Sequence, residues 1–309
     1  MTMDSKIYIA PVQGHTDAAW RHFHQLAYGG DNLYFTPFIR AEHGGVRDRD
    51  IRDYSGPMSA NHRLEPQVIF RDMEELDLLL TALSREGADK INLNMGCPFP
   101  LQTGKGRGAG FIANCSEAAK LPEIASRHPE ISLSAKMRLG YSESDEWRGI
   151  MPILNSMHLR FIVLHPRVAK QQYGGELDLD MFAGFLKESS NPVVFNGELK
   201  TPSDVTAIME RFPGIEGVML GRGLLGRPSL AAEVTAGEEW TRERRIEEML
   251  RFHDALMAYY EETLCGESQL LSKIKPFWEY AEEEIGRKAW KAIKKAGTLP
   301  KYRTALALI

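Results

Sequence analysis

Cysteine is scarce in this chain of 309 residues, which contains three: Cys97, Cys115 and Cys265. An odd number of cysteines, at spacings unlike those of metal ligands, argues against a disulfide framework and against a structural zinc site. Such sparse use of cysteine is typical of a reducing compartment. We therefore expect a cytoplasmic protein without a bound metal.

Long hydrophobic runs are also missing. No stretch of about 18 apolar residues occurs, so the sequence predicts no membrane span. Residues 1–10 lack a basic region followed by a long apolar run, so they predict no secretory signal. Hydrophobic residues make up 43% of the chain and charged residues 26%, which indicates a globular protein rather than a disordered or fibrous one.

No strong excess of one charge is present, since the formal net charge is −4. The charges are distributed unevenly, however. Residues 1–240 carry 25 Lys and Arg against 31 Asp and Glu, whereas residues 241–309 carry 13 against 11. From Ile285 to the end there are seven cations and no acidic residue. Such a segment can follow a phosphate backbone; the alternative interpretation is the solvated face of a helix.

Short apolar runs alternate with amphipathic stretches over the first 230 residues. Eight runs are predicted strands: 7–10, 33–36, 67–70, 90–93, 132–136, 161–164, 193–195 and 217–220. The predicted helices between them include 18–27, 72–86, 116–126, 179–188 and 202–211. Asp72, Ser116 and Thr201 are placed to cap three of these helices. Strands that alternate with helices predict a parallel sheet, and eight strands in about 230 residues match a closed (βα)8 barrel, an α/β fold of the TIM type.

The strand pattern stops after residue 230. Residues 240–263 predict a long helix with apolar positions at helical spacing, and residues 270–284 and 289–296 also read as helical. We therefore expect two domains, a catalytic barrel over residues 1–237 and a small helical domain over residues 238–309.

In a (βα)8 barrel the active site lies at the carboxyl ends of the strands. Nearly every predicted strand ends in or is followed by residues that can bind a ligand or carry chemistry, and Gln67 opens the third strand. The others are Pro11, Val12, Asn94, Cys97, Lys136, Arg138, His165, Arg167, Asn196, Gly197, Glu198, Gly221 and Arg222. Each residue alone has a structural explanation, but their concentration at one rim favours a functional site. The G-R-G segment at 221–223 follows the eighth strand, where barrels often bind phosphate, and Lys136 would lie near the ring of such a ligand.

The segment from Lys90 to Ile112 is the most informative. A predicted strand leads into a loop with Cys97 and then into a glycine-rich, basic stretch that contains Lys105 and Arg107. Glycines allow backbone amides to approach a ligand closely. A cysteine at a strand's carboxyl end is placed for chemistry; a buried structural cysteine beside a flexible loop is the alternative.

Seven segments carry a family resemblance: A-P-V-Q-G-H-T-D (10–17), L-N-M-G-C-P (93–98), G-K-G-R-G-A-G (104–110), A-K-M-R-L-G (135–140), L-H-P-R-V-A-K-Q-Q-Y (164–173), F-N-G-E-L (195–199) and G-V-M-L-G-R-G-L-L-G-R-P (217–228). In this order and spacing they resemble the tRNA-dihydrouridine synthase family. The resemblance covers the whole barrel and extends into K-I-K-P-F-W-E-Y (273–280). The sequence of this last segment is most similar to that of the bacterial subfamily that acts on position 16 of tRNA.

The resemblance implies an FMN-bearing barrel that uses NADPH to reduce the 5,6 double bond of uracil in tRNA. It implies that Cys97 is the general acid and that Asn94 holds the pyrimidine. The implied FMN contacts are Pro11, Val12, Gln67, Lys136, His165, Asn196, Gly197, Glu198, Gly221 and Arg222. The expected tRNA contacts are Lys105, Arg107, Arg138, Arg167, Lys273, Lys275, Lys291, Lys294 and Lys295. We expect a monomer.

Four positions depart from the family pattern. Val12 replaces a usual Met, Pro37 replaces a common Glu, and Pro166 and Val168 replace Gly and Thr. None of them removes a predicted catalytic or phosphate-binding residue. Two other functions remain open: an FMN barrel that reduces a small dihydropyrimidine or enone, and an RNA-binding barrel that has lost its activity.

Overall fold

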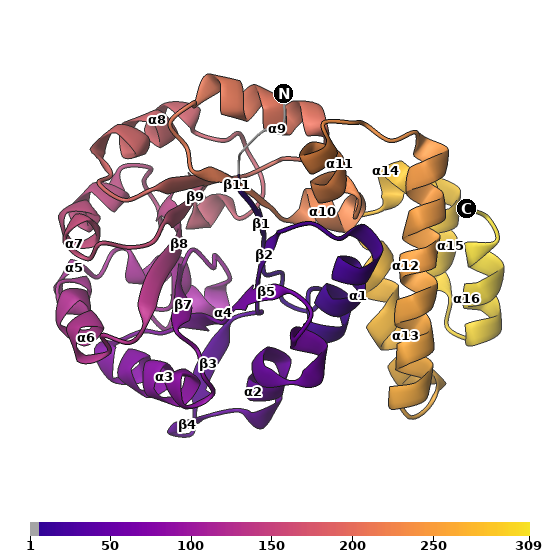
Figure 1. The fold of residues 1–309 in the computed structure, drawn as a ribbon, viewed down its shortest axis with the longest axis horizontal. Coiled ribbons are helices and arrows are strands. Elements are labelled where there is room, and N and C mark those ends of the chain that lie inside the picture. The colour runs from indigo at the N-terminus through magenta and orange to yellow at the C-terminus, as the bar shows by residue number, and fades with distance from the viewer. Residues whose placement is uncertain (1–5) are drawn as a thin grey trace.

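A parallel β-barrel surrounded by helices forms most of the molecule (Figure 1). The structure, a computed structural model, describes residues 6–309. All eight predicted strands are present: β1 (Lys6–Ile9), β2 (Leu33–Phe35), β6 (Gln67–Ile69), β7 (Lys90–Met95), β8 (Ser132–Gly140), β9 (Ile162–Val168), β10 (Val193–Asn196) and β11 (Gly217–Leu220). The prediction of a TIM barrel is therefore confirmed.

The barrel closes through a strand that Pro66 divides in two. β5 (Arg63–Glu65) pairs with β2, and β6 directly after Pro66 pairs with β7. Proline has no N–H to donate, so the strand changes partner at this residue. Its carbonyl still accepts from the backbone N–H of Asn92 at 2.9 Å.

A short hairpin after β2 was not predicted. β3 (Ile39–Glu42) and β4 (Gly45–Val46) pair antiparallel, and β3 also pairs with β6. His43 and Gly44 between them have φ of 51° and 77°, as a two-residue turn requires. Strands this short carry too few residues for a recognisable alternation.

Helices cover the outside of the barrel (Figure 1). They are α1 (Ala18–Tyr28), α2 (Asp48–Ser55), α3 (Met73–Arg85), α4 (Pro100–Thr103), α5 (Cys115–Ala118), α6 (Leu121–Arg127), α7 (Met151–Ser156), α8 (Leu179–Glu188), α9 (Pro202–Arg211), α10 (Arg222–Gly226) and α11 (Leu230–Ala236). Asp72 and Thr201 cap α3 and α9 as predicted. The cap at Ser116 is wrong, because Asn114 accepts from the N–H of Glu117 and the predicted helix is split into α5 and α6.

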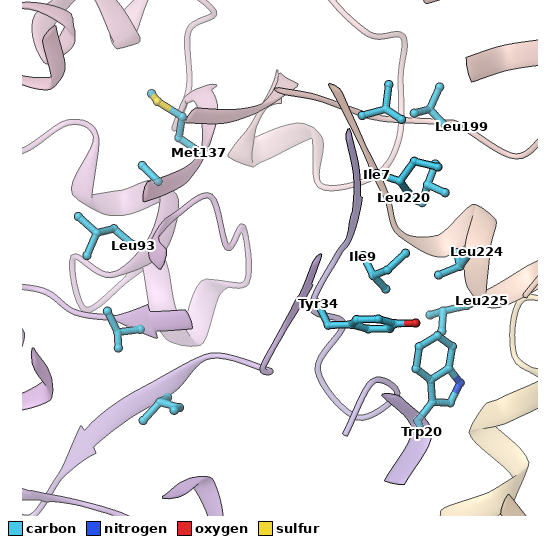
Figure 2. Packing of buried hydrophobic residues seen from close by; sticks show 14 of the residues in the cluster. Ile7, Ile9, Trp20, Tyr34, Leu93, Met137, Leu199, Leu220, Leu224 and Leu225 are labelled. Carbon is cyan, nitrogen blue, oxygen red and sulfur yellow. The ribbon is translucent and has the colours of Figure 1, made fainter. Parts of the chain in front are cut away.

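The core has two layers because side chains alternate along each strand. Ile7 and Ile9 of β1 belong to the outer layer between strands and helices, whereas Tyr8 belongs to a smaller cluster inside the barrel. Figure 2 shows Ile9 near Trp20 of α1 and Leu225 of α10 in the outer layer. The inner apolar cluster comes mainly from β1, β2 and β9–β11.

The chain ends in helices beside the barrel: α12 (Arg242–Thr263), α13 (Glu267–Ile274), α14 (Glu282–Ile285), α15 (Arg287–Lys295) and α16 (Leu299–Leu306). α12 packs along α1 (Figure 1), and the rings of Phe252 and Trp20 meet at 5.7 Å between centroids. The single helix predicted over 270–284 is wrong, because a 3-10 turn, Lys275–Trp278, begins at the residue before Pro276. α16 was not predicted.

Within residues 6–309, no helix is both long and apolar enough to cross a membrane.

Candidate active site

A cavity of about 870 Å³ opens at the carboxyl ends of the barrel strands. The structure brings nearly all the predicted rim residues to it, and those that line it are Pro11, Val12, Gln67, Asn94, Cys97, Lys136, Arg138, His165, Asn196, Gly197, Glu198, Gly221 and Arg222. Its size is that of a cavity for a cofactor or another small molecule. The concentration of chemistry-bearing residues expected from the strand ends is therefore real.

Cys97 lies just beyond β7 on a loop that an asparagine holds. The Oδ1 of Asn94 accepts from the backbone N–H groups of Gly96 and Cys97, at 3.1 and 2.9 Å. The Cys97 side chain faces the cavity but is only 8% exposed. Burial raises the pKa of its thiol, and a backbone hydrogen bond and the charges of Arg138 and Lys136 oppose that rise only in part. The thiol is therefore protonated at neutral pH and can donate a proton.

The glycine-rich segment holds the cysteine loop and does not line the cavity. Gly108 has φ of 58°, and a Cβ there would lie 2.7 Å from the carbonyl oxygen of Cys97. The N–H of Ala109 donates to that same oxygen at 3.1 Å. The glycines thus permit close packing of the loop behind Cys97, whereas the sequence suggested that they bring amides to a ligand.

Two cations on β8 enter the cavity without a carboxylate partner among residues 6–309. Burial, together with the charge of Arg138, lowers the pKa of Lys136 to about 7. Burial also lowers the pKa of Arg138 to about 10. Arg138 donates from Nη1 to the carbonyl of Val168 at 2.9 Å, while its buried Nε has no hydrogen-bond partner in the described chain. An acceptor or an anion from outside the protein would satisfy both side chains.

A carboxylate bridges two arginines at the neighbouring strand ends. Glu198 accepts from Arg167 and from Arg222, each at 2.8 Å. Burial opposes ionisation of Glu198, but the two arginines outweigh it and lower its pKa. Arg167 itself does not line the cavity; it supports Glu198 and donates to Nε2 of His165 at 3.4 Å. Burial and the surrounding cations hold the pKa of His165 well below its usual range, so the ring is neutral.

The G-R-G segment forms a tight corner between β11 and α10. A Cβ at Gly223 would lie 1.8 Å from the carbonyl oxygen of Leu199, so only glycine fits. Gly221 precedes α10 and offers no side chain to its first N–H groups, which remain available to an anion. Together with Arg222, these amides suit the phosphate of a cofactor.

Sequence reasoning missed other residues that line the cavity. The guanidinium groups of two arginines lie over the ring of Tyr173. The Cζ of Arg222 is 4.1 Å from the ring centroid, and the Cζ of Arg138 is 5.3 Å from it. Tyr173 stood within a family segment, but nothing in its spacing revealed these partners. Four carboxylates reach the cavity from the C-terminal helices: Glu279, Glu282, Glu283 and Glu284. The cations thus lie on the barrel side of the cavity and these acids on the helical side.

The expected tRNA-binding cations fall into two groups. Lys105, Lys291, Lys294 and Lys295 are exposed and have no ion-pair partner within residues 6–309. The others have intramolecular partners. Arg107 is buried against Glu75, with Nε 3.0 Å from Oε2. Lys273 pairs with Asp17 of the barrel, and Lys275 donates to the carbonyls of Lys294 and Ala296 at 2.8 and 2.9 Å.

The departures from the family pattern leave the cavity complete. Val12 lines it, and Phe38 lines it beside Pro37. Val168 offers its carbonyl to Arg138, and Pro166 offers its carbonyl to the N–H of Asp178 at 2.8 Å. Both replacements therefore act through backbone groups that any residue supplies.

The fold and this cavity define an enzyme of the TIM-barrel class. Among solved structures, morphinone reductase in complex with tetrahydroNAD has a similar fold, with a TM-score of 0.54 and 9% identity over 76% of this chain and 88% of that one. The family described as Dihydrouridine synthase (Dus) matches residues 8–307. The chain belongs to this family, and it is accordingly a flavin-dependent oxidoreductase.

Curated relatives agree with that assignment. A probable tRNA-dihydrouridine synthase of Rhizobium leguminosarum bv. phaseoli is 27% identical over 268 residues, which cover 86% of this chain and 83% of the relative. Another from Staphylococcus aureus (strain COL) is 28% identical over 261 residues, which cover 82% and 77%.

Proposed function

We propose that this enzyme reduces specific uridines of tRNA to 5,6-dihydrouridine, with FMN as cofactor, NADPH as reductant and Cys97 as general acid. One observation carries the proposal: the buried thiol of Cys97 shares a cavity with the glycine corner at 221–223 and with two cations that have no carboxylate partner within residues 6–309. The names of the relatives support tRNA as the substrate.

The residues of the cavity fit FMN. Gly221, Arg222 and the first N–H groups of α10 would hold its phosphate. Pro11 and Val12 would pack on the ring, and Gln67, Lys136, His165, Asn196, Gly197 and Glu198 would surround it. When bound and reduced by NADPH, the flavin supplies a hydride.

Cys97 completes the reduction by supplying a proton. The double bond of uracil gains a hydride at one carbon and a proton at the other, so two electrons and two hydrogens are added. The thiol donates the proton to the second carbon and recovers it from water. A raised pKa keeps the thiol protonated before the reaction, and Arg138 and Lys136 stabilise the thiolate that is left.

The substrate base would enter beside Asn94 and Arg138, which both line the cavity and retain N–H groups for its carbonyl oxygens. The exposed cations Lys105, Lys291, Lys294 and Lys295 would contact the RNA backbone. Arg107, Lys273 and Lys275, which are already paired, would shape this surface, and Arg167 would orient Glu198 and His165.

The decisive experiment joins cofactor and product. We expect the purified chain to bind FMN, to be reduced by NADPH, and to restore dihydrouridine in tRNA from a strain that lacks the gene. Sequencing of the modified sites identifies the position, with position 16 as the first expectation. Turnover of small enones or dihydropyrimidines without tRNA would favour the second FMN enzyme, and RNA binding without flavin would favour a barrel that has lost its activity.

A further inference from the structure

One side of the barrel interior is polar although it is buried. On β6, β7 and β8, the residues Gln67, Asn92 and Ser134 lie directly opposite one another in register. They are 1%, 0% and 0% exposed, so each polar atom there needs a partner within the protein. Of these three, only Gln67 lines the cavity.

The cysteine loop sets the direction of the hydrogen bonds at one end. Backbone N–H groups of Gly96 and Cys97 donate to Asn94, and an N–H cannot accept. The atom that receives them is therefore the carbonyl oxygen of the Asn94 amide. Its nitrogen must donate, and it does so to Oε1 of Gln67 at 2.7 Å.

The same direction passes on through the barrel. Since Oε1 of Gln67 accepts, its Nε2 donates to Oδ1 of Asn92 at 2.8 Å. Asn92 in turn donates from Nδ2 to the hydroxyl of Ser134 at 2.8 Å. No amide in the series can be reversed without placing two donors or two acceptors against each other.

A carboxylate imposes this direction from the other end. Ser134 donates to Oε2 of Glu65 at 3.5 Å, the longest link of the series. Glu65 is 1% exposed and forms an ion pair with Arg160. Burial raises the pKa of Glu65, while Arg160 and the Ser134 hydrogen bond hold that rise back. The Ser134 hydroxyl therefore donates its proton to Glu65, and its oxygen accepts from Nδ2 of Asn92.

We propose that Asn92 and Ser134 are positioning residues: the one-way series of hydrogen bonds from Asn94 to Glu65 fixes the amides of Gln67 and Asn94 so that each keeps one N–H donor for a ligand in the cavity. Each amide has a second N–H beyond the one used in the series. The pair therefore selects ligand groups that accept, such as the carbonyl oxygens of a flavin or a pyrimidine. The nature of these ligands rests on the proposed function; the orientation of the amides does not.

The test removes the hydroxyl far from the cavity and observes the amide at the cavity. Ser134→Ala removes the acceptor of Asn92 Nδ2 and so loosens the hold of Asn92 Oδ1 on Gln67. The two Nε2 proton signals of Gln67, observed by NMR of the full chain labelled with ¹⁵N-glutamine, should therefore shift. Comparison with Gln67→Glu assigns these signals. Ser134→Thr keeps the hydroxyl and should restore them.

Ser229→Ala is the matched control. Ser229 is buried like Ser134, and it donates to Glu233, a carboxylate that is also paired with an arginine but has no part in the hydrogen-bond series. It should leave the Gln67 signals unchanged. FMN should bind Ser134→Ala about three- to tenfold more weakly than the control variant, the range for one neutral hydrogen bond. If Ser134→Ala and Ser229→Ala give the same Gln67 signals, the positioning role is refuted. If the wild-type protein binds no FMN, the proposed function fails. The amide signals of Gln67 still show whether Ser134 positions it.

Discussion

Individual residues at the barrel rim have pKa values that differ from those they have in water. Burial keeps the Cys97 thiol protonated, and it lowers the pKa of Lys136 to about 7. The two pKa values shift in opposite directions but for the same reason, since burial favours the neutral form of both the thiol and the amine. Both depend on the burial of the two groups by the surrounding protein, and both can be measured.

Replacement of Cys97 isolates the proton transfer. Cys97→Ala should still bind FMN and accept hydride from NADPH, because the thiol takes no part in either step. It should slow the reoxidation of reduced flavin by tRNA by about 10²–10⁴-fold, the range for loss of a general acid. Single-turnover absorbance measures this step directly. Cys115→Ala and Cys265→Ala are controls, since both of these cysteines are exposed and outside the cavity. Reoxidation at the wild-type rate in Cys97→Ala would assign the acid elsewhere.

The affinity for FMN should depend on pH through Lys136. Its pKa of about 7 means that the amine is half neutral at that pH, and the acceptor atoms of the flavin ring, beside which Lys136 would lie, favour the charged form. Binding above this pH therefore takes up a proton, and affinity should fall by up to about tenfold per pH unit as the pH rises from about 7 to about 9. The phosphate, with a second pKa of about 6, is already fully ionised in this range.

Lys136→Arg provides the comparison, because arginine stays charged throughout this range. Its FMN affinity, measured by quenching of flavin fluorescence, should be nearly independent of pH. An equal slope in wild type and Lys136→Arg would show that another group takes up the proton.

The rim residues were predictable from sequence, but their partners were not. Residues after parallel strands must converge, so Cys97, Lys136 and Asn196 could be placed together from strand ends alone. The bridge from Glu198 to Arg167 and Arg222 depends on a left-handed backbone at Glu198, with φ of 48°, which the sequence gives no reason to expect. The burial of Arg107 likewise depends on Glu75, which is 32 positions away in the chain.

The strands and helices with a clear apolar pattern were predicted from the sequence. Those whose bounds depend on a single proline or a short turn were not. The eight strands and α8 and α9 followed from apolar runs, helical spacing and caps. The division at Pro66, the hairpin of β3 and β4, and the break at Pro276 depend on how a proline or a short turn meets its neighbours. Asn114 rather than Ser116 caps α5. Both side chains can accept a hydrogen bond at a helix N-terminus, and only the path of the loop in the folded protein decides which one does.

The glycine-rich loop offers a prediction with an internal control. Gly106 and Gly108 both have left-handed backbones, with φ of 73° and 58°. A Cβ at Gly106 meets nothing within 4 Å, whereas one at Gly108 would lie 2.7 Å from the carbonyl oxygen of Cys97. Gly106→Ala should therefore cost only about 1–2 kcal/mol of stability from backbone strain. Gly108→Ala should cost more and should also displace Cys97.

Thermal unfolding and single-turnover reoxidation separate the two effects. Gly106→Ala should unfold at a lower temperature but reoxidise its flavin with tRNA at the wild-type rate. Gly108→Ala should reoxidise more slowly even at temperatures where it is fully folded. Equal rates in the two variants would mean that the loop does not position the cysteine.

The molecule as a whole joins the barrel to the C-terminal helices by charged and aromatic contacts. Lys273 and the Tyr260 hydroxyl both reach Asp17, and His15 lies 2.8 Å from Glu279 across the same junction. The division into domains at residues 237 and 238 stays a prediction, although the left-handed Gly237 ends α11 there. Buried residues of barrel and helices belong to one continuous cluster, which no sequence pattern of either part could reveal.

Charge is distributed over the molecule in a way that predicts where RNA binds. Lys291, Lys294 and Lys295 are exposed on α15, at the far side of α12 from the barrel (Figure 1). Lys294 lies 4.1 Å from the ring centroid of Trp290, and no carboxylate neutralises the three lysines within the described chain. Reversal of these charges should therefore weaken tRNA binding and reduce its dependence on salt.

The salt dependence distinguishes a binding surface from a solvated one. For each duplex phosphate contact that is lost, the slope of log affinity against log salt should fall by about 0.9, and by about 0.7 for a single-stranded region. Filter binding of unmodified tRNA to the variant with Lys291, Lys294 and Lys295 replaced by Glu measures this slope. Lys187→Glu on α8, an exposed lysine on the barrel wall away from α15 in Figure 1, is compared with Lys294→Glu alone, since each single replacement changes the net charge by the same amount. Because net charge acts equally at both sites, a smaller slope in the α15 variant alone locates the phosphate contacts there, and equal slopes would show that α15 is only a solvated face.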